Sequence, residues 1–354
     1  MEINELLYTE KFNFKQLIEF QDMLANIDQI SFDDIVSIIS SNFLKNKETL
    51  RQYLYSIKFA IEWRPKNFNK YCQLLEQESK IIKDNFSSDE LCVEILTNDF
   101  IRLRLYELGL IDIESLRKIA TLNISSKDFF KHELENDQID IEKDKLRHEG
   151  MHENYLYQLI RKDDLNEFQH VLSISSIDIN SCVTFSLFEI SSIINDYLRL
   201  PRLIEYAAFF GSIQIFKYLL LNEAEVTSRL PEFAVAGGNY EIIHILEDME
   251  LSFQKTMYYA IRFHRNEIAQ YLNENHSIKL ATYMLQTCVL YYNVEELIEL
   301  LCTNDDFQIN SKDHGMTILM FAAENGYLDL VRLFSMVKGI NINICNEVDV
   351  YYYI

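Results

Sequence analysis

The sequence contains little glycine and proline, with eight and three residues respectively in a chain of 354. Turns of all-β folds and proline-rich linkers depend on these two residue types. Their scarcity favours helices that are joined by short polar loops. Apolar residues make up 48% of the chain, which is ample for large cores, and the length suggests about two domains.

The chain also lacks the marks of secretion and of membrane insertion. Its six cysteines are dispersed and include no C-x-x-C pair, so we expect reduced thiols. The opening M-E-I-N-E-L-L-Y has neither the basic flank nor the apolar core of a signal peptide. No apolar run approaches the ~20 residues of a membrane-spanning helix. We predict a cytoplasmic protein that does not bind membranes.

Basic residues are scarce as well. Lysine and arginine number 33 against 55 acidic residues, which gives a net charge of −22. Nucleic-acid binding relies on basic side chains that neutralise phosphates, so we expect no nucleic-acid partner. The phosphate-binding and nucleophile motifs G-x-x-x-x-G-K-[ST], G-x-G-x-x-G and G-x-S-x-G are absent from the sequence. We therefore predict no cofactor.

The strongest positive feature is a nine-residue phrase that recurs five times in the C-terminal half. Offsets +4, +5, +7 and +8 from the first residue of each copy are apolar, and offset +3 is Gln, Glu or Asp. A unit of this size cannot bury its apolar face alone, so copies must stack on one another. The phrase predicts an α-solenoid. Its copies are GSIQIFKYL from Gly211, GNYEIIHIL from Gly238, HRNEIAQYL from His264, NVEELIELL from Asn293 and GYLDLVRLF from Gly326.

The last unit, D-H-G-M-T-I-L-M-F-A-A-E-N-G-Y-L-D-L-V-R-L (313–333), resembles an ankyrin repeat. Thr317 stands where the family's threonine caps the first helix, and Ala322 and Ala323 are small where helices pack closely. Ile318 and Met320 replace the usual proline and histidine. The copies start 27, 26, 29 and 33 residues apart, and only the last step matches the ~33 residues of a full unit. The earlier units are expected to lack the β-finger.

Taken together, these units resemble an ankyrin-type domain of unknown function that is expanded in some single-celled eukaryotes. The matching text is 205–211 and 233–242, and R-P-K-N (64–67) and H-E-N-Y-L-Y (152–157) resemble the helical region that precedes it and its junction. The resemblance implies an all-α fold and protein binding, and it supplies no catalytic residues.

The predicted organisation is an N-terminal helical domain followed by an ankyrin-type α-solenoid with mostly finger-less short repeats. The charged segment 133–149 marks either the domain boundary or a solvated helix, and 173–200 is expected to be an insertion with a loop and a short helix. The predicted ranges are 1–140 for the helical domain, 150–340 for the repeat domain (repeats near 151–172, 201–222, 229–249, 255–274, 281–302 and 313–336) and 341–354 for a truncated terminal segment.

Candidate partner-binding residues follow from the resemblance, since the two residues before each turn glycine face the groove of an ankyrin domain. Aromatic residues and arginine are frequent among them, as in binding hot spots. The alternative is that these rings cover repeat edges or pack on the N-terminal domain. The candidates are Phe209, Phe210, Arg262, Phe263, Tyr291, Tyr292, Glu324 and Asn325, with His314 and Met316 at the tip of the last finger.

One short segment points to chemistry. His148-Glu149-Gly150-Met151-His152 fits H-E-x-x-H, in which two histidines one helical turn apart bind zinc. Gly150 weakens such a helix by about 1 kcal/mol, and charged residues flank the motif. We therefore predict no metal and no catalytic residue, and keep a zinc-dependent hydrolase as the alternative. The predicted function is a protein–protein interaction module or adaptor with an unknown protein partner.

Overall fold

The computed structural model describes residues 14–135, 140–276, 278, 281–303, 309–313 and 315–345. Within these residues the protein is all-α, as predicted. No strand forms there, and two isolated β-bridges are present, Cys182 with Arg202 and Asp313 with Met316. The second bridge closes the turn at Gly315, where a φ of +81° favours glycine. This bridge lies in the last repeat, the one unit for which a finger is predicted.

The N-terminal region is a packed group of helices around α4. Helix α4 begins where the side chain of Asn46 accepts a hydrogen bond from the backbone N–H of Thr49, and it ends before Pro65, which starts a 3₁₀ turn. The helices are α2 (Phe14–Ala25), α3 (Phe32–Ile38), α4 (Lys47–Trp63), α5 (Phe68–Gln77), α6 (Ser79–Asn85), α7 (Asp99–Glu107), α8 (Ile113–Leu122), α9 (Ile124–Phe129) and α10 (Lys131–Glu135), with π-helical turns at Ile39–Phe43 and Glu90–Ile95.

The C-terminal region consists of helix pairs. The first helices stack side by side in one layer, and the second helices α13, α15 and α17 stack in another. The domain limits themselves stay a prediction. The pairs are α12 (Tyr155–Lys162) with α13 (Leu165–Ile174), α14 (Leu203–Phe209) with α15 (Ile213–Leu221), α16 (Leu230–Gly237) with α17 (Tyr240–Asp248), α18 (Met257–Arg262) with α19 (Asn266–His276), α20 (Thr282–Leu290) with α21 (Val294–Thr303), and α22 (Ile318–Glu324) with α23 (Leu328–Met336).

The first residue of the repeated phrase is the turn between the two helices of a pair. Gly211, Gly238, His264 and Gly326 all have positive φ there. In the fourth copy, however, the left-handed residue is Tyr292 (φ +53°), one position before the predicted Asn293. The phrase is therefore misaligned by one residue in that copy, because only the register from Asn293 puts apolar residues in all four slots. The true register places Glu296 in a buried slot, where burial raises its pKa to about 8.

Two connecting segments differ in how well the sequence predicted them. The charged stretch contains helix α11 (Ile141–Glu149), which packs on α5 and is held by the buried Arg147 and its partners Glu133 and Asp144. The insertion between α13 and α14 contains no helix, so the predicted short helix is wrong. Its irregular backbone is instead anchored by bonds such as that from the N–H of Val183 to the carbonyl of Pro201, at 2.7 Å.

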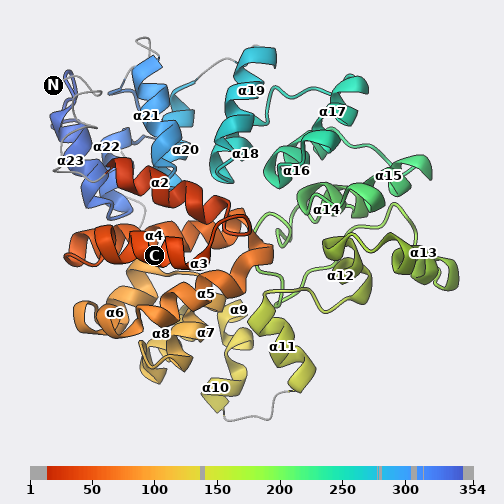
Figure 1. Ribbon diagram of the computed structural model, residues 1–354, viewed down its shortest axis with the longest axis horizontal. Coiled ribbons are helices and arrows are strands. Elements are labelled where there is room, and N and C mark those ends of the chain that lie inside the picture. The colour runs from red at the N-terminus through yellow and green to blue at the C-terminus, as the bar shows by residue number, and fades with distance from the viewer. Residues whose placement is uncertain are drawn as a thin grey trace.

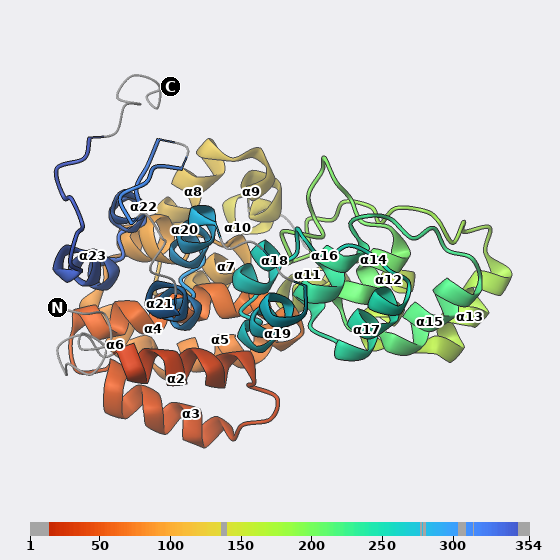
Figure 2. The same ribbon diagram turned by 90° about the horizontal axis from the view of Figure 1, so that it is seen from above.

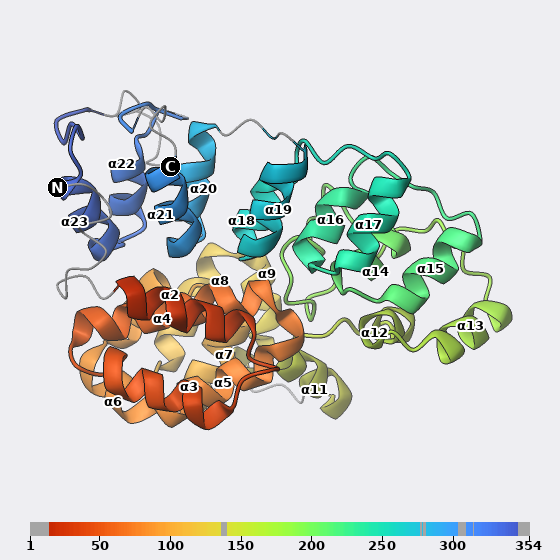
Figure 3. The same cartoon turned by 45° about the horizontal axis from the view of Figure 1, so that its top comes forward.

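The repeats curve over the N-terminal helices, which lie on the inner side of the arc (Figure 1). Figure 3, in which the molecule is turned by 45°, shows α2 and α4 next to the later pairs, α18–α23. The pairs α12–α17 extend beyond the N-terminal helices (Figure 2). Buried residues of both regions form one continuous hydrophobic core, so the repeats and the N-terminal helices are packed as one body.

Gly237 offers a test of the close packing between the first helices. A Cβ atom there would lie 2.2 Å from the carbonyl oxygen of Ala208 and 2.7 Å from that of Phe209, both on α14. Alanine normally stabilises a helix by about 1 kcal/mol relative to glycine. We expect Gly237→Ala to destabilise the protein instead. The free energy of unfolding should fall by about 2 kcal/mol or more, because backbone atoms must move to make room for the methyl group.

Urea unfolding of the full chain measures the effect, with Gly109→Ala as the control. Gly109, unlike Gly237, has a positive φ (+64°), and the nearest atom to its Cβ position is 3.9 Å away. The control should lose only about 1 kcal/mol, which is the strain of a left-handed backbone. Equal losses in the two variants would contradict the close packing of α14 and α16.

Candidate functional site

The candidate site is the groove on the inner side of the repeats, formed by the C-terminal ends of the first helices and the turns that follow. In this protein α4 fills the groove. Residues at three- and four-residue steps along one face of α4 contact successive repeats, and their order runs opposite to that of the repeats. The contacts run from Glu48 with Arg332, through Gln52 with Asp329, Tyr55 with Tyr327 and Tyr292, and Phe59 with Tyr291, to Trp63 with His264.

The centre of this contact is a buried carboxylate. Asp329 of α23 accepts hydrogen bonds from the hydroxyl of Tyr292 at 2.5 Å and from the side-chain amide of Gln52 at 3.0 Å. The backbone N–H of Leu330 donates to its other oxygen. Burial raises the pKa of Asp329, and the hydrogen bonds from Tyr292 and Gln52 oppose that rise. Asp329 thus connects both parts of the chain through polar contacts within an apolar environment.

Aromatic rings surround this carboxylate. Tyr55 packs edge-on against Tyr327 with ring centroids 4.8 Å apart and against Tyr292 at 5.6 Å. Further along α4, the indole of Trp63 stacks on the imidazole of His264 at 4.2 Å. Aromatic pairs of this kind contribute about 0.5–1.5 kcal/mol each beyond the area they bury. These pairs join α4 to three different repeats.

Basic side chains just after α4 continue the contact to the earlier repeats. The guanidinium of Arg64 donates to the carbonyls of Phe263 and His264, at the C-terminal end of α18. The ammonium of Lys66 donates to the carbonyl of Phe210 at the end of α14, at 2.8 Å. Helix ends carry carbonyls without intrahelical partners and a partial negative charge, so cations bind well there. Burial lowers the pKa of Lys66 to about 8.

The predicted partner-binding residues divide by their position in the groove. Phe209, Phe210, Phe263 and Tyr292 are buried in contact with their neighbours or the N-terminal region, which agrees with the packing alternative and leaves them inaccessible in this arrangement. The others are not buried: Arg262, Tyr291, Asn325 and Met316 are half-buried and Glu324 is exposed. His314 lies outside the described residues.

The residues of α4 that fill the groove were missed in the sequence. Leu50, Tyr53, Leu54, Ile57 and Ile61 recur at helical spacing on one face of α4 and are all buried. R-P-K-N was noticed only as a resemblance. The sequence does contain a sign that the other face of α4 is also covered. That face has the aromatic and amide side chains Gln52, Tyr55 and Phe59 at helical spacing.

The H-E-x-x-H segment does not form the helical face that the zinc motif requires. Helix α11 ends at Glu149, and Gly150 has φ +59°, so His152 lies outside the helix. His148 contacts Glu107 and the carbonyl of Asp144. His152 is buried, and its Nε2 contacts the carbonyl of Thr184. The two imidazoles point to different partners, so this geometry does not support the zinc hydrolase alternative.

Two family models match the chain. Residues 314–347 match the ankyrin repeat, and residues 221–300 match a domain of unknown function, DUF3447. The ankyrin match lies on the last repeat, which contains α22 and α23. These matches confirm the resemblance seen in the sequence, and the ankyrin repeat supports a protein-interaction role. No curated protein matches the chain. Among the described residues, no helix is long and apolar enough to cross a membrane.

The buried Asp329 gives the groove contact a pH dependence. Its raised pKa means that the folded protein keeps this proton to a higher pH than the unfolded chain does. The stabilisation that comes from the protonated Asp329 is complete below about pH 4, near the ordinary pKa of aspartate. It is lost as the pH rises through the raised pKa of the folded protein. Replacing it by asparagine removes this titration.

We therefore expect the wild type to be most stable relative to Asp329→Asn in acid, and to lose this advantage steadily towards neutral pH. The measurement is urea unfolding of both full-length proteins between pH 4 and pH 8. All other titrations cancel in the difference between the two proteins. A difference that stays constant or grows with pH would contradict the burial of an ionisable Asp329 in the groove.

Proposed function

We propose that this ankyrin-type protein binds a protein partner along the open edge of its groove, while its own α4 fills the inner part. The observation that supports this most is a group of accessible residues on neighbouring first helices. We call it the edge patch: Tyr258, Arg262, Tyr283, Leu290 and Tyr291. Tyr283 and Leu290 are 39% and 38% exposed.

The edge patch is ordered by contacts among its members. The hydroxyls of Tyr258 and Tyr291 lie 2.6 Å apart, and the guanidinium of Arg262 lies over the ring of Tyr291, 5.2 Å from its centroid. Arg262 also donates to the hydroxyl of Ser192 in the insertion and pairs with Glu62 of α4 at 3.6 Å. Tyrosine and arginine are the residue types that dominate binding hot spots. A surface that is already ordered loses little entropy on binding.

The charge of the chain supports a protein rather than a nucleic acid as the partner. Acidic residues exceed basic ones by 22, and a polyanion would be repelled. The predicted groove residues Glu324, Asn325 and Met316 continue the same edge on the last repeat, and they extend the proposed contact surface. An adaptor role, with a second partner on the N-terminal region, and a cytoplasmic location stay predictions.

The test is site-specific photo-crosslinking in full-length protein expressed in its own cells. A photoreactive phenylalanine analogue in place of Tyr291 or Tyr283 should capture the same protein partner. The same analogue in place of Tyr155, which is 53% exposed on α12, should not capture it. Tyr155 is matched in residue type and lies on a first helix outside the edge patch.

Affinity provides the second measurement once the partner is captured. Arg262→Ala and Tyr291→Ala should each weaken its binding by about tenfold or more, corresponding to the more than about 1 kcal/mol expected of a hot-spot residue. Circular dichroism and urea unfolding show whether each variant is folded. Capture from Tyr155 but not from the edge patch, or unchanged affinity in both folded variants, would overturn the proposal.

A further inference from the structure

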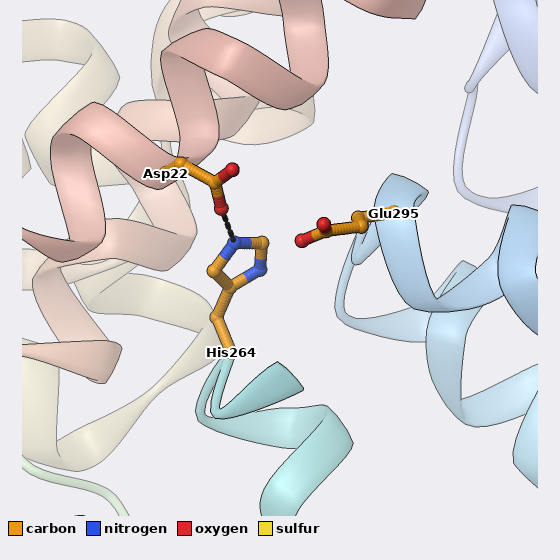
Figure 4. Close-up of side chains that lie close together, drawn as sticks. All are labelled: Asp22, His264 and Glu295. Atoms are coloured by element: carbon orange, nitrogen blue, oxygen red, sulfur yellow. Dashed lines mark hydrogen bonds and ion pairs between the residues drawn. The ribbon is translucent and has the colours of Figure 1, made fainter. Parts of the chain in front are cut away.

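Three potential metal ligands from distant parts of the sequence meet between the N-terminal region and the repeats. Asp22 lies on α2, His264 in the turn between α18 and α19, and Glu295 on α21. One donor atom of each residue lies within 4.8 Å of the other two. Figure 4 shows the imidazole of His264 between the carboxylates of Asp22 and Glu295. The cluster joins the N-terminal region to two repeats.

His264 is an unusual residue for its position. It is 3% exposed and occupies the left-handed turn position with φ +48°, where most copies of the repeat have glycine. Its Nε2 lies 3.3 Å from a carboxylate oxygen of Asp22. Its other ring nitrogen, Nδ1, is buried and has no hydrogen-bond partner. Nε2, the ring nitrogen that faces Asp22, is therefore the donor that an ion shared with that carboxylate would use.

Glu295 is held in place by a chain of amide side chains. The side-chain amide of Asn266 donates to one of its carboxylate oxygens. Asn293 donates in turn to the side-chain oxygen of Asn266 at 2.8 Å and to the carbonyl of Ile261 at 3.0 Å. Partners of this kind orient metal ligands in proteins. The second carboxylate oxygen of Glu295 takes no part in this chain, and Figure 4 shows the carboxylate directed towards His264.

The surroundings give access to the cluster and a favourable charge. A cleft of about 460 Å³ opens there and is lined by all three residues. The same cleft is lined by the carboxylates of Glu267 and Glu299 and by the guanidiniums of Arg64 and Arg265. Four carboxylates against two guanidiniums leave a net charge of −2, and both guanidiniums donate to backbone carbonyls.

We propose that Asp22, His264 and Glu295 bind one divalent transition-metal ion, with Zn²⁺ as the probe. Zinc bonds of ~2.0–2.2 Å in a tetrahedron place ligand atoms roughly 3.3–3.6 Å apart. Nε2 of His264 and a carboxylate oxygen of Asp22 already lie 3.3 Å apart, within this range. The remaining contacts close by about 1 Å when the accessible carboxylates of Asp22 and Glu295 turn. An imidazole ligand favours zinc over calcium or magnesium, and water from the cleft completes the coordination.

The bound ion ties α2 to the repeats and so strengthens the closed groove. Its effect is independent of any partner at the edge patch. Only protein that is already folded brings the three ligands together, since they are separated by up to 273 positions from Asp22 to Glu295. The ion therefore stabilises the folded state by mass action.

The test is a titration of chelator-treated full-length protein with ZnCl₂, followed by calorimetry and by thermal unfolding. We expect one ion per chain, and a rise in Tm of several degrees when free Zn²⁺ is ~100-fold above its Kd. Asp22→Asn and Glu295→Gln should each weaken binding by about tenfold or more. Both side chains are partly exposed, so these variants keep the fold.

The control is Glu247→Gln. Glu247 contacts His244 at 2.7 Å and His276 at 2.6 Å, so it forms the centre of a second histidine–carboxylate cluster on the outer helices. This variant should bind Zn²⁺ as the wild type does. The proposal is overturned if the wild type binds no stoichiometric ion at micromolar Zn²⁺. It is equally overturned if binding is lost in Glu247→Gln but kept in Asp22→Asn and Glu295→Gln.

Discussion

Helix α4 is buried on two faces, and the arrangement of the whole chain depends on this. One face, with Leu50, Leu54 and Ile57, packs in the N-terminal core. The other face, with Gln52 and Tyr55, lies against the last repeats. A helix of this length spans roughly 25 Å, or about three stacked helices at 8–10 Å each. The repeats and the N-terminal helices are therefore not two separate modules.

The polar contacts along α4 decide its register in the groove. Apolar side chains alone would tolerate sliding, because the hydrophobic effect has no direction. Asp329, in contrast, accepts hydrogen bonds from Gln52 and Tyr292 at one position only, and Arg64 donates both to Ala25 at the end of α2 and to Phe263 at the end of α18. Leaving either charge buried without partners would cost several kcal/mol. These contacts account for a specific intramolecular fit, with the edge patch left open beside it.

The repeated phrase was enough to predict the all-α fold and the helix pairs, because period and burial are local properties. The cap at Thr317, whose hydroxyl accepts from the N–H of Met320, also followed from the unit itself. The turn at Tyr292 was misplaced by one residue, since the acidic Glu296 occupies an apolar slot. The insertion before α14 was assigned a helix that does not form, because its anchoring contacts are specific to this chain.

The candidate site was only partly predictable. The sequence singled out Phe210, Phe263 and Tyr291 as groove candidates, but it could not show that residues of the N-terminal region lie against them. The covering residues are distant in the chain: Tyr55 and Gly326, for example, lie 271 positions apart. No periodicity links positions so far apart. The contact between Asp22 and His264 could not be predicted from the sequence either, because it depends on how α2 packs against the repeats.

The occupied groove is tested most directly by a double-mutant cycle between Gln52 and Asp329, one residue from each part of the chain. The free energies of unfolding of the wild type, Gln52→Ala, Asp329→Ala and the double variant are compared. If α4 lies in the groove, the two losses are not additive, and the coupling is about 1 kcal/mol or more. Losses that add to within about 0.3 kcal/mol would contradict the account, because residues that do not touch behave independently.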